Sequence, residues 1–288
     1  VEVERTARGY SIRQATRAAG VSRSTFAYRT RGRPPTDRAI RRLLLSDAIA
    51  SVHAQSRGVY GYRRVQAALR IESDLVVNHK LVASIMAQLG IHGLPRRRSR
   101  RRNLVHVATS SDLVNRDFTA TAAKQLWVTD ITEHPTREAR VHTCVVLDAY
   151  SRKAVGWAIS RRADTTLVDS AIEMAASTRP FTPKTIIHTD HRPQFTAWAF
   201  TTNLRAYELR LSMGTVGDCY DNALIESFWG RMETELFNTC TWSTVEQLSV
   251  AIADYIENFH NTRRRHSALD MHTPTEFETL NPPQLHHA

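Results

Sequence analysis

The sequence "LWVTDITEHPT", residues 126–136, is an apolar run that reaches Thr-Asp before it turns polar. The same ending occurs in "IIHTDHRPQF" at 186–195, and "DNALIESFWGRMETEL" at 221–236 places a Glu inside a helical pattern. The acids in question are Asp130, Asp190 and Glu226. A single Asp at a strand end usually serves a turn or a cap, so their significance depends on whether one fold brings all three together.

The pattern of residues 124–262 predicts alternating strands and helices. Strands are expected at 125–135, 141–150 and 153–160, a helix at 165–178, a strand at 184–190, a helix at 194–207, a strand at 208–213, and helices at 221–238 and 243–262. This order gives a mixed α/β sheet flanked by helices. It is the element order of an RNase H-like domain.

In an RNase H-like sheet, the fourth strand lies beside the first, so the three acids should converge at one edge. Two Asp and one Glu are hard oxygen ligands, which suit Mg²⁺ or Mn²⁺ rather than zinc. A site with two such ions supplies what phosphodiester chemistry requires, because it activates the attacking oxygen and stabilises the leaving one. Without a metal, three clustered carboxylates would repel one another, so the cluster is costly unless it is used.

Three further residues are expected to support this site. His188 precedes Asp190 by two positions, so it points to the same face of its strand. Asn222 lies four residues before Glu226, on the same side of its helix, although a cap is the alternative for this position. Asp148 ends a strand and is interpreted as mainly structural or as a support for the site. For His188, simple packing in the core remains an equal alternative.

The charge is unevenly distributed along the chain. The net charge is +11, and residues 1–123 hold 23 Lys and Arg against 8 acids, whereas residues 124–288 hold 16 against 20. Such asymmetry indicates a nucleic-acid-binding half joined to a half with another task. A merely solubilising surface is the alternative, but the excess is nearly all Arg, which is the better ligand for phosphates and base edges.

The first helical pattern, at residues 11–32, resembles a helix-turn-helix. Ser11 and Ser22 can cap its two helices, Gly20 allows the turn, and Phe26 faces inward, as do Ile12, Ala15 and Ala19 on the first helix. The second helix would present a polar surface to DNA. The residues expected on that surface are Arg23, Ser24, Thr25 and Arg29.

A second helical module follows, with helices expected at 37–55, 58–70 and 78–90. It is either another DNA-binding module or a structural bundle, and its expected DNA contacts are Arg63, Arg64 and Lys80. The chain is therefore divided into a helix-turn-helix-like segment at 1–35, a helical DNA-binding module at 36–94, a basic linker at 95–122 and a catalytic core with a helical extension at 123–288.

Two arginine-rich segments are expected to contact DNA phosphates. The linker sequence "PRRRSRRR" repels itself unless an anion neutralises it, and a flexible tether is the alternative. Its arginines are Arg96, Arg97, Arg98, Arg100, Arg101 and Arg102. The later cluster "RRRHS" contributes Arg263, Arg264 and Arg265.

The composition excludes several other classes of protein. No apolar run reaches the roughly 18 residues of a membrane span, so no membrane partner is expected. Cys144, Cys219 and Cys240 are scattered without a CxxC pair, which argues against a disulfide framework or a zinc finger. This cysteine usage suggests a reducing cytosol.

The chain resembles a known family: the transposases of bacterial insertion sequences of the third IS family, specifically the second reading-frame product. It is more distantly similar to retroviral integrases. The matching segments are "WVTDIT", "LDAYSRKAVGW", "HTDHRPQF", "GDCYDNALIESFWGRMETEL" and "NTRRRHSALDMHTPTEF", together with "VYGYRRVQAAL" and "VNHKLVASIMAQLGIHG". Glu226 follows Asp190 with 35 residues between them, which is the spacing that DDE enzymes use.

The resemblance implies a metal-dependent enzyme that cuts and joins DNA strands. Asp130, Asp190 and Glu226 would be its catalytic triad and its metal ligands, holding two Mg²⁺ or Mn²⁺ ions. Its partners would be double-stranded DNA, namely the terminal repeats of the element and the target, and further copies of the chain. An upstream reading-frame product would be a further partner. The resemblance also implies a location in the bacterial cytoplasm, in association with the nucleoid.

Four positions depart from the family pattern. Arg192 and Asp270 stand where Gly is usual, Glu233 stands where Lys or Arg is common, and His260 stands where Tyr is usual. These departures leave open a degenerate copy that acts only as a DNA-binding regulator. An RNase H-like nuclease that cuts without joining is the other alternative.

Overall fold

The computed structural model describes residues 9, 11–30, 35–95, 114, 120–179, 185–190, 195, 204, 207–213 and 223–282, with Arg29 and Thr30 described by their backbone alone. The chain divides into two compact units, Val1–Ile49 and Ala50–Ala288. The predicted helix at 194–207 lies almost entirely outside the described residues, as do the linker arginines from Arg96 to Arg102.

The amino-terminal unit contains two short helices, α2 (Ile12–Ala18) and α3 (Arg23–Thr30). Both predicted caps are confirmed: Ser11 forms a capping box with Gln14, and the Ser22 hydroxyl accepts from the Thr25 amide at 3.0 Å. Gly20 adopts the positive φ of 63° that the turn between the helices requires.

The predicted buried face of the amino-terminal pair is only partly correct. Ala15 and Phe26 are buried as expected. Ile12 is 43% exposed and Ala19 is also exposed, while the polar Thr16 is buried because its hydroxyl bonds back to the Ile12 carbonyl.

Three helices follow: α4 (Asp37–Gln55), α5 (Tyr62–Ser73) and α6 (His79–Gln88). The predicted range of α4 is confirmed residue for residue, and Asn78 caps α6 by accepting from the Lys80 amide at 2.8 Å. The sequence predicted the start of α5 too early, because Gly58 adopts a positive φ and Gly61 is the true amino-terminal cap. The pair α5 and α6 pack against each other through residues such as Val65, Leu69, Val82 and Ile85.

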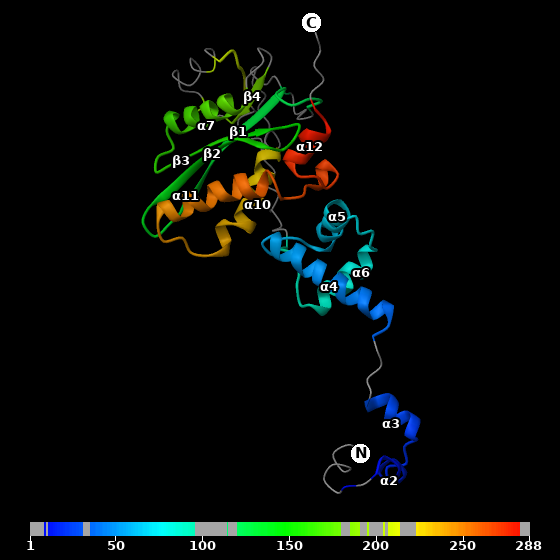
Figure 1. Ribbon diagram of the computed structural model, residues 1–288. Helices are drawn as coiled ribbons and strands as arrows, with labels where there is room; N and C mark the ends of the chain where they lie inside the picture. The colour runs from blue at the N-terminus through cyan, green and yellow to red at the C-terminus, as the bar shows by residue number, and fades with distance from the viewer. Residues whose placement is uncertain are drawn as a thin grey trace, which may run out of the picture. The chain divides into compact units, whose positions relative to one another are not determined.

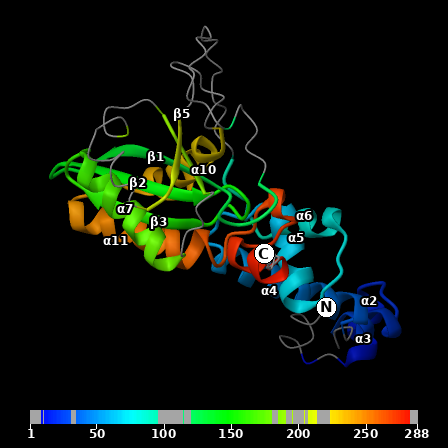
Figure 2. The same ribbon diagram turned by 90° about the horizontal axis from the view of Figure 1, so that it is seen from above.

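A five-stranded mixed sheet forms the centre of the larger unit (Figures 1 and 2). Its strands are β1 (Leu126–Pro135), β2 (Arg140–Asp148), β3 (Ala154–Ser160), β4 (Ile186–Thr189) and β5 (Arg210–Met213), in the spatial order β3-β2-β1-β4-β5. The first three form an antiparallel meander, and β4 and β5 add in parallel beside β1. The predicted RNase H-like order is confirmed, including the position of the fourth strand beside the first.

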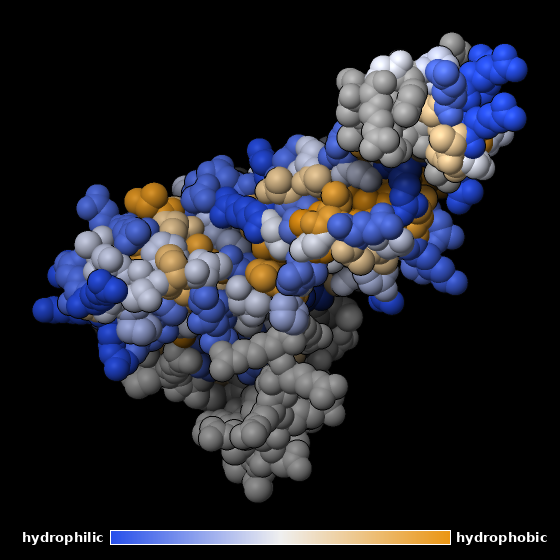
Figure 3. Space-filling model, turned by 90° about the horizontal axis from the view of Figure 1, so that it is seen from below, coloured by the Kyte–Doolittle hydropathy of each residue, from blue (hydrophilic) through white to orange (hydrophobic). Residues whose placement is uncertain are grey.

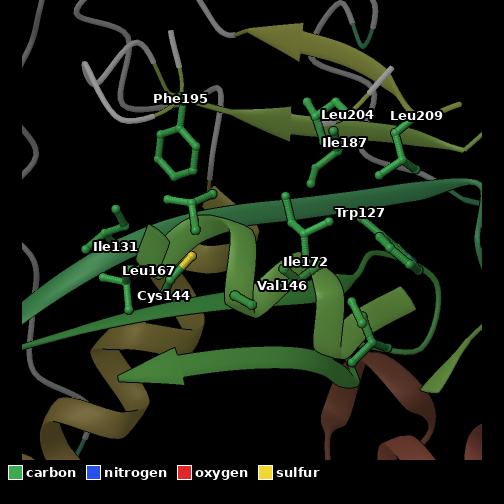
Figure 4. Packing of buried hydrophobic residues seen from close by; sticks show 14 residues of the cluster. Trp127, Ile131, Cys144, Val146, Leu167, Ile172, Ile187, Phe195, Leu204 and Leu209 are labelled. Carbon is green, nitrogen blue, oxygen red and sulfur yellow. The ribbon is translucent and has the colours of Figure 1, made fainter. Parts of the chain in front are cut away.

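Helices cover both faces of this sheet. Helix α7 (Thr165–Thr178) lies on one face, and α10 (Ala223–Glu235) and α11 (Val245–Asp254) lie on the other (Figure 1). The α7 face holds a closed hydrophobic cluster that includes Trp127, Cys144, Val146, Ile172 and Ile187 (Figure 4). Because side chains alternate along a strand, residues 126, 128 and 130 of β1 point to the opposite face, toward α10.

The carboxy-terminal region departs from a regular helix. The predicted single helix at 243–262 is not a regular α-helix throughout. Beyond α11 it continues as a π-helix, η2 (Tyr255–His260), in which each backbone hydrogen bond spans one residue more than in an α-helix. Phe259 and His260 of this segment are buried. Short 3₁₀ turns lie at η1 (Phe237–Thr239) and η3 (Ser267–Leu269). Helix α12 (Pro274–Leu280) was not predicted from the sequence. Its start has a recognisable signal, because Thr273 and Glu276 form a capping box and Pro274 is the first helical residue.

The outer edge of β3 is held by a side chain rather than by another strand. The Asn261 amide accepts from the Ala154 N–H at 2.9 Å and donates to the Ala154 carbonyl at 2.9 Å. The hydroxyl of Thr178 also donates to the Val155 carbonyl. The backbone groups at the start of this edge strand are therefore satisfied from within the chain.

The surface mixes polar and apolar residues, as one face shows in Figure 3. Large apolar side chains are exposed at Leu43, Leu44, Val76 and Val250. Within the described part of the chain, none of the helices combines the length and the apolar character needed to cross a membrane.

Gly156 supplies a test of this packing. A Cβ at this position of β3 would lie 2.1 Å from the Ala171 carbonyl oxygen and 2.7 Å from the Ala175 Cβ on α7. We expect Gly156→Ala to lower the free energy of unfolding by about 3 kcal/mol, because strand and helix must separate. Urea denaturation measures the effect.

Gly230 is the matched control for Gly156. It lies in α10, and a Cβ added there would meet no atom within 4 Å, so Gly230→Ala should be neutral or stabilising by up to about 1 kcal/mol. Equal losses in the two variants would contradict the close contact between β3 and α7.

Candidate active site

The first two candidate carboxylates are aligned by the parallel pairing of β1 with β4. Leu126, Trp127 and Val128 pair with Ile186, Ile187 and His188. Continuing this register by two residues sets Asp190, which directly follows β4, opposite Asp130 on the same side of the sheet. The sheet therefore brings the two Thr-Asp endings of the sequence side by side.

Helix α10 joins this edge through a tryptophan. The indole Nε1 of Trp229 donates to Asp130 Oδ2 at 3.1 Å, and the Asp130 Oδ1 accepts from the Ile131 amide at 2.7 Å. Because Glu226 precedes Trp229 by three residues, it lies on the same side of α10, one turn away. The Trp229 bond thus links the helix that carries Glu226 to the strand that carries Asp130.

Glu226 itself is exposed, and partial burial of its carboxyl group raises its pKa above the ordinary value. No hydrogen bond or ion pair joins its side chain to another described residue. A carboxylate that is partly desolvated and lacks a cationic neighbour favours either a proton or a metal ion.

The donor set fits a hard divalent cation, because it consists of carboxylate oxygens and two of them lie on adjacent strands. Within the described ranges, however, no three His, Cys, Asp or Glu side chains approach closely enough to hold one ion. The strand pairing and the Trp229 bond place β1, β4 and α10 at one edge of the sheet, and a metal site shared by Asp130, Asp190 and Glu226 stays a prediction.

Comparisons with known proteins agree with this architecture. Residues 120–219 and 207–274 match integrase core domain families, and residues 40–99 match an HTH-like domain family. The chain is 32% identical over 289 residues to transposase InsF for insertion sequence IS3A of Escherichia coli, which covers 98% of each chain. The chain belongs to the insertion-sequence transposases of the third IS family.

Other relatives of this transposase are similarly close. The transposase for insertion sequence element IS904 of Lactococcus lactis is 33% identical over 251 residues, covering 86% of this chain and 99% of the relative. Among solved structures, a simian T-cell lymphotropic virus intasome in complex with PP2A regulatory subunit B56 gamma aligns with a TM-score of 0.45 at 16% identity, covering 82% of this chain and 76% of that one. The HTH-like match over α4, α5 and α6 supports the second helical module as a DNA-binding one.

The predicted supporting residues have different surroundings in the transposase. His188 is buried, and its Nδ1 lies 3.0 Å from the Ser212 hydroxyl of β5, so it ties two strands on the α10 side of the sheet. Asn222 lies outside the described residues.

Asp148 occupies the opposite face of the sheet from Asp130. It pairs with Trp127, whose side chain lies in the α7 cluster, and accepts from the Lys124 and Tyr150 amides and from Arg179. Burial raises the pKa of Asp148, and these donors and the Arg179 charge oppose that effect. This position favours the structural interpretation of Asp148 over a supporting role at the carboxylate edge.

The basic cluster at 263–265 is mostly internal, which corrects the prediction of a DNA-facing surface there. Arg264 is 1% exposed and forms a forked pair with Glu235, with Nε and Nη2 at 2.7 and 2.5 Å from the carboxylate oxygens. Arg265 is 1% exposed and pairs with Glu72 and Glu276. Buried guanidinium groups with carboxylate partners serve the fold, and only Arg263 of the three is exposed.

The other predicted DNA contacts divide by exposure. Arg23, Ser24, Thr25, Arg63 and Lys80 are exposed, which leaves their DNA contacts as predictions. The hydroxyls of Ser24 and Thr25 also lie within hydrogen-bond distance of Ser22 in the α3 cap. Arg64 is half-buried and the Arg29 side chain lies outside the described residues.

Three of the four departures from the family pattern can be located. Asp270 has a φ of 49°, which explains why Gly is usual there. Glu233 lies near His134: burial lowers the pKa of His134 and the Glu233 charge opposes that effect. His260 is buried between the rings of Phe228 and His266, and Arg192 lies outside the described residues.

Sequence reasoning missed the role of Trp229, and its spacing of three from Glu226 was the available signal. We expect Trp229→Phe to weaken Mg²⁺ binding about 10-fold, because Asp130 loses the donor that orients it. Isothermal titration with Mg²⁺ measures the change. Trp157→Phe is the control, since the Trp157 Nε1 has no partner among the described residues, and equal affinities in both variants would refute the orienting role.

His260 predicts how stability changes with pH. Burial, opposed by the bond to the Arg152 carbonyl and aided by the charges of Arg264 and Arg231, lowers the pKa of His260 to about 3. The unfolded chain takes up this proton below about pH 6.5 and the folded chain does not, so stability is lost as pH falls from 6.5 toward 3. From pH 7 to 5 we expect a loss of about 2 kcal/mol from this group.

The measurement is the urea unfolding free energy of the wild type and of His260→Phe at several pH values. The variant should be less stable at pH 7, because it loses the hydrogen bond to the Arg152 carbonyl. Its unfolding free energy should, however, decrease less steeply as the pH is lowered. His266, whose pKa is also lowered by burial, contributes to the slope in both proteins. Parallel curves would show that His260 does not remain neutral in the fold.

Proposed function

We propose that this chain is a DDE transposase that cleaves and joins DNA strands at the ends of an insertion sequence. The observation that carries the proposal is the parallel pairing of β1 with β4, together with the hydrogen bond from Trp229 of α10 to Asp130. Extending this register by two residues would set Asp190 opposite Asp130, and Glu226 lies one turn before Trp229 on α10. Family membership supports it, because insertion-sequence transposases share the integrase core.

In this proposal, the three carboxylates hold Mg²⁺ or Mn²⁺, most simply as two ions. When bound, such ions neutralise the phosphate in the transition state and favour both the attacking and the leaving oxygen. Asp130 is oriented for this task by the Trp229 and Ile131 N–H groups. Partial burial raises the pKa of Glu226, and a cation held beside it would oppose that effect.

The reaction has two displacements at phosphorus. Water first attacks a phosphodiester at the element end, which frees a 3′-hydroxyl. That hydroxyl then attacks a phosphodiester of the target, breaks its P–O3′ bond and joins the strands without a covalent enzyme intermediate. The chain's own part is to hold the ends in line, which requires double-stranded DNA on the helical modules and at least two copies of the chain.

The deciding experiment follows labelled duplex carrying the terminal repeats, in Mg²⁺, Mn²⁺ or EDTA. Wild type should nick and join the duplex only with metal, and Glu226→Gln should lower both rates by at least about 1,000-fold, because one ligand of the metal site is lost. Glu233→Gln is the matched control, since it removes the same charge two turns along α10 and should retain both activities.

The other outcomes distinguish the alternatives. Cleavage without joining would indicate a plain nuclease. Binding without either reaction would indicate a regulator or a disabled copy, and the double change Arg192→Gly and Glu233→Lys would restore activity only in the disabled copy.

A further inference from the structure

A small basic cavity lies on another side of α10. Its volume is about 90 Å³, and its walls include four arginines from separate parts of the chain. Arg64 comes from α5, Arg152 from the turn between β2 and β3, Arg231 from α10, and Arg264 from the segment after η2. The hydroxyl-bearing residues Ser227 and Ser267 also line it.

The positive charge of this cavity is poorly compensated. No Asp or Glu lines it, and the only carboxylate hydrogen-bonded to any of its arginines within the described chain is Glu235, which binds Arg264. Arg264 still has a buried Nη1 with no described partner. Arg152 and Arg231 form no ion pair with the described residues, and Arg64 has only the ring of Tyr60 beneath it, 5.9 Å from the centroid.

The surroundings lower the pKa of three of these guanidinium groups. Burial, followed by the charges of Arg264 and Arg64, lowers the pKa of Arg231 to about 10. Burial also lowers the pKa of Arg152, and burial together with the Arg264 charge lowers that of Arg64. Like charges that are partly removed from water destabilise one another unless an anion lies among them.

We infer that this cavity is a binding site for a tetrahedral oxyanion of the phosphate type. Arg64, Arg152 and Arg231 would supply charged N–H donors from three sides, and the Arg264 Nη1 would supply a fourth. Ser227 and Ser267 add hydroxyl donors at the wall. The inference goes beyond the proposed strand transfer and does not depend on it.

The size of the cavity limits the ligand. A volume of about 90 Å³ corresponds to roughly three water molecules at ~30 Å³ each, which suits one phosphate group. It is well below the ~300 Å³ at which pockets begin to take drug-sized organic molecules. The phosphate can be a free ion or a single group of a DNA backbone that enters from outside.

An anion bound in the cavity would affect the candidate active site, because both are built on α10. Ser227 and Arg231 are four residues apart and share one side of this helix, whereas Glu226 and Trp229 lie on the neighbouring side. An anion held by Ser227 and Arg231 would also bind Arg64 of the HTH-like domain and Arg152 of the sheet. It would therefore fasten three parts of the larger unit around the helix that carries Glu226.

The first test uses inorganic phosphate and the full chain, without DNA or divalent metal. At saturating phosphate, the melting temperature of the wild type should rise by about 5 °C relative to sodium chloride of the same ionic strength. Arg231→Gln and Arg152→Asn should lose this shift, and Asn suits the positive φ of 61° at position 152. Arg63→Gln, an exposed arginine beside Arg64, should keep it.

A second readout separates an anion site from simple structural support. Without phosphate, Arg231→Gln and Arg152→Asn should melt no lower than the wild type, because each removes an uncompensated charge. With phosphate, the wild type should have a higher melting temperature than either variant. If the phosphate shift is absent from the wild type, or is the same in all four proteins, the site is refuted, whatever the strand-transfer assay shows.

The source of the phosphate is then assigned with duplex DNA. If a DNA phosphate occupies the cavity, the slope of log affinity against log salt should become shallower by about 1 in Arg231→Gln. An unchanged slope, with the phosphate-dependent melting shift retained in the wild type, assigns the cavity to the free ion.

Discussion

The parallel pairing of β1 with β4 is the constraint on which the rest of the structure depends. It is a contact between strands separated by about fifty residues, and its register, extended by two residues, sets Asp190 opposite Asp130. The meander β1–β3 and helix α7 bury the other face of the same sheet, which fixes the register. A shift of β4 by one residue against β1 would turn Asp190 into that hydrophobic cluster, so the core and the carboxylate edge are specified together.

Helix α10 connects the remaining features. On one side of the helix, Trp229 donates a hydrogen bond to Asp130. On the next side, Ser227 and Arg231 line the basic cavity, and at the end of the helix Glu235 accepts from Arg264. Burial would raise the pKa of Glu235, but the bonds and charge of Arg264 lower it below the ordinary value. The hydroxyl of Tyr255 also donates to Glu235 at 2.8 Å. The helix is thus held at its far end by a buried charge pair, while its first turn carries the candidate metal ligand.

The sequence was sufficient for features that local pattern or motif controls. The helix at 165–178, the caps at Ser11 and Asn78, and the strand order all follow from periodicity, capping chemistry and the RNase H-like arrangement. The three candidate carboxylates were selected from sequence motifs in the same way, and their role as a site stays a prediction.

Other features depend on contacts that one dimension does not show. Arg264 and Arg265 lie in a run that is typical of an exposed basic surface. Their burial is explained by carboxylate partners elsewhere in the chain, namely Glu235 for Arg264, and Glu72 and Glu276 for Arg265. The sequence left two roles open for Asp148, and only its pairing with Trp127 shows that it lies on the face opposite Asp130. The π-helical turn has no clear local signature, since it accommodates the packing of Phe259 and His260 rather than a sequence preference.

The Asn261 amide at the border of the sheet has a consequence for how copies of this chain can assemble. An outermost strand normally offers its free N–H and C=O groups to any extended segment that approaches, which is a common route to polymerisation. At the start of β3, the side-chain amide of Asn261 makes the two hydrogen bonds to the Ala154 N–H and C=O that a neighbouring strand would otherwise make. Pairing of another copy with this end of β3 is therefore disfavoured, because it would first have to displace the Asn261 amide from Ala154.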